Sequence, residues 1–81
     1  MTEQKRRDIL VECVKRFGRQ EWFRDATVYE QHPISGAPTI EIKCNYRPIL
    51  GPDRKAVIDF AQECNLQERY LVVDKQGKPV E

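Results

Sequence analysis

Apolar residues recur at helical spacing in two separate segments of the chain. The first segment runs from Thr2 or Glu3 to Phe17, and the second follows Pro52, which suits a first helical turn because its missing N–H would be unpaired there. In each segment the apolar positions repeat at i, i+1, i+4, i+5 and i+8, which places them on one side of a helix. They are Ile9, Leu10, Cys13, Val14 and Phe17 in the first helix and Ala56, Val57, Phe60, Ala61 and Cys64 in the second. Two matching apolar sides predict one shared surface beneath both helices.

Three shorter segments have the composition of β-strands. Ala26–Gln31 and Tyr70–Asp74 are short runs with β-branched and aromatic residues, and Thr39–Tyr46 alternates between two sets of side chains. One set is Ile40, Ile42, Cys44 and Tyr46, expected to face the core, and the other is Thr39, Glu41, Lys43 and Asn45, expected to face solvent. His32–Pro38 contains two prolines and a glycine and is predicted to be a turn. The first two strands are therefore expected to form a hairpin.

Two residues are predicted to end the helices. Gly18 suits a left-handed conformation after the first helix, and Asn65 suits the end of the second. The segment Arg19–Asp25 carries Trp22 and Phe23, which are expected to reach the core. The pattern leaves open whether this segment extends the first helix or breaks from it.

The order helix, strand, strand, helix, strand predicts an α+β fold, a two-layer sandwich with both helices on one face of a small three-stranded sheet. The other face stays open. Its expected members are Thr27, Tyr29, Thr39, Glu41, Lys43 and Asn45. A chain of 81 residues suits a single domain, residues 1–81, because a core of this size cannot be divided. Its ordered core is expected at about residues 3–75, with a loose tail at 76–81.

Charge limits the range of functions. The chain has 14 Lys and Arg against 13 Asp and Glu, a net charge of +1. A dominant basic field, which is typical of many nucleic-acid-binding and membrane-binding domains, is therefore excluded, whereas a local basic patch is not. No apolar run follows the N-terminal residues, which favours a cytoplasmic protein without a membrane segment.

The residues that most often carry catalysis or bind metals stand apart from one another. Cys13, Cys44 and Cys64 lie on predicted apolar faces without a CxxC pair, so they are expected to be small buried hydrophobes. A thiol-dependent enzyme would need an exposed, activated cysteine and is the lowest-ranked alternative. His32 lies beside Pro33 in the turn and is expected to be solvated. With no carboxylate pair or phosphate-binding glycine loop, the sequence predicts a protein that is not an enzyme and has no metal or cofactor.

Residues 46–75 carry a more specific pattern. Tyr46–Arg54 leads into a helix with Val57, Phe60, Ala61, Glu63 and Leu66, and Glu68–Lys75 follows. This arrangement resembles the Arg-x-x-x-His domain, a small module that binds single-stranded DNA or RNA. The family similarly has an aromatic-proline strand end, an Asp-Arg helix start and a final arginine-aromatic-aliphatic strand. Its arginine corresponds to Arg54, whereas its histidine corresponds to Ile58, and the loop before the last strand is shorter in this chain.

The resemblance implies an accessory domain for single-stranded DNA or RNA, without a choice between the two. Basic side chains are expected to contact phosphates and tyrosines to stack on bases. These residues are Arg47, Arg54, Lys55, Arg69, Tyr29 and Tyr46. Because Ile58 places an aliphatic group beside Arg54, where the family has an imidazole, we expect weak and strongly salt-dependent binding.

The open sheet face allows a second function. A near-neutral charge and an uncovered face suit a protein-interaction module, such as an adaptor or inhibitor. A second copy of the chain packed on the same face would give a homodimer. The identity of the partner is not contained in the sequence pattern.

Overall fold

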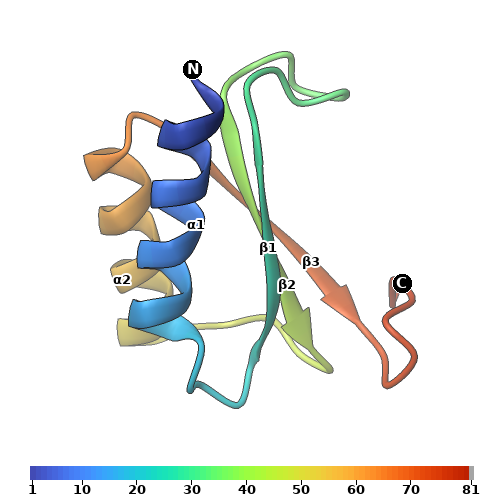
Figure 1. The fold of residues 1–81 in the computed structure, drawn as a ribbon. Helices are drawn as coiled ribbons and strands as arrows, with labels where there is room; N and C mark the ends of the chain where they lie inside the picture. Colours follow the sequence, from blue (N-terminus) through green and yellow to red (C-terminus); the bar gives the residue numbers. More distant parts are fainter. Residues whose placement is uncertain (81) are drawn as a thin grey trace.

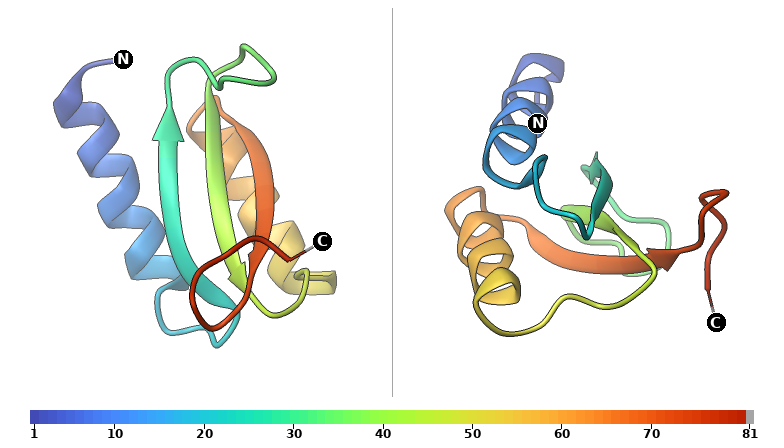
Figure 2. Two further views of the ribbon diagram at one scale, coloured as in Figure 1. Left: turned by 90° about the vertical axis from the view of Figure 1, so that its right-hand side faces the viewer. Right: turned by 90° about the horizontal axis from the view of Figure 1, so that it is seen from below.

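The computed structural model describes residues 1–80 and has two helices packed against one three-stranded sheet (Figure 1). The elements are α1 (Glu3–Phe17), β1 (Phe23–Tyr29), β2 (Thr39–Asn45), α2 (Gly51–Glu63) and β3 (Gln67–Val73). Strand β2 is central; it pairs antiparallel with β1 and parallel with β3, and α2 is the crossover that a parallel pair requires. Helix α1 packs on β1 and α2 on β3, on the same side of the sheet (Figures 1 and 2). The predicted two-layer α+β fold is confirmed.

The core lies between the helices and the sheet. Ile40, Ile42 and Cys44 of the central strand are completely buried, as the alternation along β2 predicts. The helices contribute narrower apolar sides than their sequence spacing suggests. Val14, expected in the core, is 54% exposed, and Ala56 is exposed as well. Helix α1 meets the sheet through residues at i, i+4 and i+8, and Val14 lies about 100° around the helix from Cys13. No helix in residues 1–80 is long and apolar enough to cross a membrane.

The two helix ends differ from each other. Gly18 has φ −62° and donates its N–H to the Val14 carbonyl at 2.8 Å, so the predicted left-handed ending of α1 is wrong. The chain instead leaves α1 through two tight turns, closed by the N–H groups of Gln20 and Phe23. Asn65, by contrast, has φ +58° and ends α2 in the left-handed conformation that its residue type favours.

The strand boundaries also shift. Strand β1 begins at Phe23 rather than Ala26, and β3 begins at Gln67 rather than Tyr70. The polar start of β3 is drawn into the sheet by pairing, residue by residue, with β2 from Thr39 onward. Tyr46 falls outside β2, because its φ of +68° turns the chain, and its side chain points away from the core.

The face opposite the helices is less open than expected. The β1–β2 loop folds over one end, where His32 is only 4% exposed and Thr39 is also buried. The expectation of a solvated loop histidine is therefore wrong. His32 accepts the Ile34 N–H at Nδ1 (3.1 Å), and its Nε2 lies 3.4 Å from a Glu41 carboxylate oxygen, so the ring anchors the loop to the sheet.

A turn after β3 covers the other end of this face (Figure 2). The sequence predicts a loose tail at 76–81; within the described part, residues 74–80 instead return to β3. The Asp74 carboxylate accepts the N–H groups of Gln76 and Lys78, both at 2.9 Å, and Val80 donates to the Val72 carbonyl at 2.8 Å. Val73 is buried beneath this turn. Glu81 lies outside the described residues.

Candidate functional site

The end of the domain where β2 finishes and α2 begins holds two neighbouring hollows. Their volumes are about 250 Å³ and about 310 Å³, and both are lined by Trp22 and Arg47. The first hollow is completed by Pro48, Ile49, Leu50 and Asp53, and the second by Glu21, Asn45 and Tyr46. We call this region, residues 21–22 and 45–53, the Trp22 end. In Figure 1 the α1–β1 and β2–α2 connections meet there.

Asn45 joins these two connections. Its N–H donates to the Trp22 carbonyl at 2.8 Å, and its side-chain amide donates to the Glu21 carbonyl at 3.1 Å. The next residue, Tyr46, donates its N–H to the Val73 carbonyl at 2.9 Å. The backbone on both sides of the hollows is therefore fixed by the sheet.

Tyr46 is both strained and exposed. A φ of +68° is rare for a bulky residue and costs roughly 1–2 kcal/mol relative to right-handed conformations. Its side chain is 60% exposed and lies outside the hydrophobic core, so packing does not explain an aromatic residue at this position. Strain of this kind tends to concentrate at functional sites.

Trp22 combines burial with an unsatisfied polar group. The side chain is 5% exposed and packs against Phe17 and Phe23, with ring centroids 5.8 Å and 6.1 Å away. Within the described part of the chain, its Nε1–H has no hydrogen-bond acceptor. A buried unpaired donor costs about 1–3 kcal/mol, and such groups are few in native proteins.

The start of α2 adjoins the smaller hollow. Leu50 occupies the N-cap position and, in residues 1–80, no side chain caps the first turn by a hydrogen bond. The free N–H groups of such a helix start attract anions, an effect that Asp53 in the same turn partly offsets. Arg47 is exposed and forms no ion pair with another described residue.

The six binding residues predicted from the sequence fall into separate groups. Tyr46 and Arg47 lie together at the Trp22 end, and Arg54 and Lys55 follow in α2. The Arg54 guanidinium lies 5.1 Å from the Tyr70 ring centroid, which holds it at the β3 side of the helix. Lys55 forms an exposed ion pair with Asp59 at 3.0 Å.

Tyr29 and Arg69, the other two, lie on the sheet face opposite the helices. The Tyr29 ring contacts His32 edge to face, with centroids 4.9 Å apart. Arg69 Nε is 3.9 Å from a carboxylate oxygen of Glu41, whose side chain is 12% exposed. His32 and Glu41 thus engage the groups nearest to them, and this cluster stabilises the loop over the face.

Sequence reasoning missed Trp22 as a site residue, together with Asn45 and Leu50. The tryptophan falls in the segment whose structure the pattern left open. Its position between two hollows follows from the meeting of two loops that are distant in sequence, which no local signal encodes.

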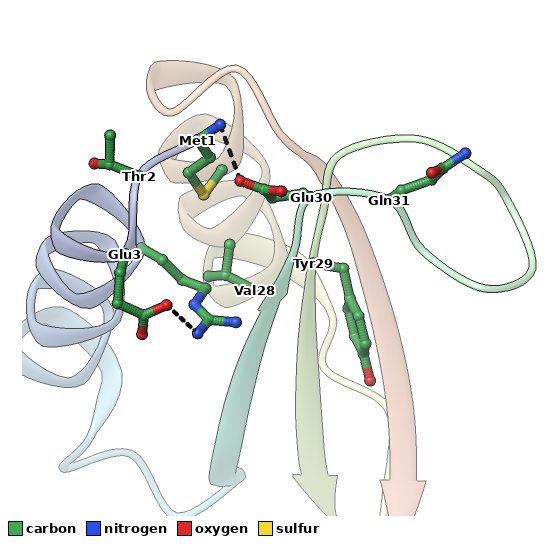
Figure 3. A pocket seen from close by; sticks show the side chains of 8 residues that line it. Met1, Thr2, Glu3, Val28, Tyr29, Glu30 and Gln31 are labelled. Atoms are coloured by element: carbon green, nitrogen blue, oxygen red, sulfur yellow. Dashed lines mark hydrogen bonds and ion pairs between the residues drawn. The ribbon is translucent and has the colours of Figure 1, made fainter.

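Other candidate chemistry is weak. Burial raises the pKa of all three cysteine thiols, that of Cys13 to about 11, so at neutral pH they are protonated and poorly nucleophilic. Residues 1–80 contain no group of three or more His, Cys, Asp or Glu residues placed to hold a metal ion. Another hollow, of about 430 Å³, lies between the start of α1 and the end of β1 (Figure 3). Its charged groups pair locally, Met1 with Glu30 at 2.9 Å and Arg6 with Glu3.

A scan against models of protein families, a search of curated proteins and a search of solved structures each find no match for this chain. The resemblance of residues 46–75 to the Arg-x-x-x-His domain stays a prediction.

Proposed function

We propose that this protein is a small non-enzymatic domain that binds single-stranded DNA or RNA at the Trp22 end. The observation that carries the proposal is Tyr46, an exposed aromatic ring held at positive φ beside the unpaired Arg47. Proteins that bind single strands combine aromatic rings, on which bases stack, with cations that follow the phosphates. Tyr46 and Arg47 supply one group of each kind on adjacent residues.

The phosphates are assigned to Arg47, the uncapped start of α2, and Arg54 and Lys55 on its first turns. Three cationic contacts to a single strand predict that log K falls with log salt with a slope of about −2. The carboxylate of Asp53 lies among these groups and weakens attraction of an anion. Binding is therefore expected to be weak and to be lost at moderate salt.

A protein partner or a second copy on the open sheet face is the alternative. The β1–β2 loop and the turn after β3 occupy both ends of that face, and the Glu41 cluster lies between them, so little apolar surface is offered. A partner bound there would be insensitive to changes at Arg47. Light scattering and salt-resistant capture of a protein would favour it.

The test is fluorescence anisotropy with short labelled single strands of DNA and RNA in low salt. We expect Arg47→Ala to weaken binding several-fold and Tyr46→Ala to weaken it roughly tenfold, the loss typical of one stacked base. Arg7→Ala is the matched control, because it removes the same charge from an exposed position on α1. Its binding should stay close to wild type.

Two results would reject the proposal. One is the absence of any association at low salt with every strand tested. The other is an equal loss in Arg47→Ala and Arg7→Ala, because attraction would then depend only on net charge.

A further inference from the structure

The smaller hollow at the Trp22 end has the size of a subsite for a single ring. Its volume of about 250 Å³ lies below the range of about 300–1,000 Å³ typical of pockets for drug-sized ligands. Its lining is mainly apolar, from Trp22, Pro48, Ile49 and Leu50, with Arg47 and Asp53 adding charge. A flat, partly polar group fits such a lining better than a bare phosphate.

Trp22 adds a specific demand to this hollow. Its Nε1–H is a donor only, so an occupant must present an acceptor to satisfy it. The nitrogen is covered in the unbound protein. Arg47 and Leu50, its neighbours in the hollow, are exposed side chains, which change rotamer within nanoseconds. Opening a path to the donor therefore requires side-chain movement and no change in the fold.

We propose that this hollow holds one pyrimidine base whose carbonyl oxygen accepts a hydrogen bond from Trp22 Nε1–H. Pyrimidines carry ring carbonyl oxygens and consist of one ring, which matches both the donor and the volume. The base enters beside Tyr46 and Arg47, while the adjoining phosphate faces the start of α2. The inference rests on the proposed function, and it adds selectivity to a site that would otherwise bind any sequence.

The chain offers a direct reporter, because Trp22 is its single tryptophan. Unlabelled oligothymidylate and oligoadenylate of equal length are titrated into the protein while tryptophan emission is recorded. We expect oligothymidylate to bind more tightly and to change the emission at saturation. Thymidine monophosphate at high concentration should produce a change of the same sign, and adenosine monophosphate a smaller one.

The variant Trp22→Phe separates hydrogen bonding from strand flexibility. Thymidylate strands also bind well because they are flexible, but that advantage is the same for both proteins. Phe keeps an aromatic ring against Phe17 and removes the donor. The ratio of thymidylate to adenylate affinity should fall roughly fivefold, as expected for one lost neutral hydrogen bond, while the salt slope is unchanged. Circular dichroism and thermal unfolding check that the variant is folded.

The outcomes separate this inference from the proposed function. If no strand binds, both fall. If strands bind in an Arg47-dependent manner but Trp22→Phe leaves the affinity ratio unchanged, the pyrimidine subsite is rejected and the proposed function stands. If the variant fails to fold, wild-type emission decides: a saturating pyrimidine strand that leaves it unaltered rejects the subsite.

Discussion

Tyr70 shows how a single aromatic residue can be predicted correctly as part of a strand and still hold an unexpected group. Its ring packs against the helix-side core and under Arg54, and its hydroxyl is buried without a partner among residues 1–80. Desolvation raises the pKa of this phenol to about 12, with the charge of Glu68 adding to the effect and Arg54 opposing it. The alternation of β3 indicates the strand, but a missing hydrogen bond depends on which atoms surround the hydroxyl in three dimensions.

The raised pKa of Tyr70 predicts a fall in stability at alkaline pH. Because the folded pKa lies above the unfolded value of about 10, the stabilisation is complete below pH 10 and is lost between about pH 10 and 12, where the unfolded state releases the proton first. Tyr70→Phe should flatten this part of the curve and be neutral or slightly stabilising at pH 7. Urea unfolding across that pH range measures it; equal slopes in variant and wild type would contradict the assignment.

The end of α2 is the element whose sequence signal proved most direct. Asn65 takes the left-handed conformation, and two hydrogen bonds close the helix: Leu66 N–H to the Ala61 carbonyl at 2.9 Å and Asn65 N–H to the Gln62 carbonyl at 3.1 Å. This pair of bonds is the Schellman ending, in which Gly or Asn is preferred. Gly18 failed as a comparable signal, because a glycine permits a left-handed residue without requiring one.

Substitutions at Asn65 should follow backbone preference rather than side-chain contacts. Asn65→Ala is expected to destabilise the domain by about 1 kcal/mol, since alanine is disfavoured at positive φ. Asn65→Gly serves as the control and should be neutral or stabilising. Chemical denaturation of the three proteins gives the comparison, and a loss of the same size in both variants would mean that the amide side chain matters instead.

The arrangement of the complete domain departs from the sequence expectation mainly on the sheet face opposite the helices. His32 joins the β1–β2 loop to Glu41 of the central strand and to the Tyr29 ring, and Thr39 is buried below. At the other end Arg24 lies against the turn after β3, with one guanidinium nitrogen 3.4 Å from the Lys75 carbonyl. The face that appeared to be free for a partner is thus occupied at both ends by the chain itself.

Removing the His32 ring should release this loop. His32→Ala deletes the acceptor for the Ile34 N–H, the contact with Glu41 and the packing on Tyr29, and we expect a loss of about 2 kcal/mol. Amide exchange of residues 30–38 should become faster, while that of α2 follows only the global change. Ile34→Ala, at an exposed position of the same loop, should have little effect. Unchanged exchange in the loop of His32→Ala would show that other contacts hold it.

The sequence therefore located much of the candidate site but not its composition. Arg47 and Tyr46 were identified because a basic and an aromatic residue adjoin a helix start, and they do line the two hollows. Tyr29 and Arg69 were grouped with them by residue type alone, and they lie elsewhere because strand register places them on the opposite sheet face. Trp22 could not be assigned, since its role depends on the contact between the α1–β1 and β2–α2 connections.

By itself, the sequence determined the two helices, the three strands, their order and the layer in which the helices lie. Those properties follow from local periodicity and from the need to bury one apolar side of each element. Only the tertiary structure decided which residues share a surface, which polar groups are left unpaired and where the open face is covered. These depend on contacts between segments far apart in the chain, whose geometry no short stretch of residues encodes.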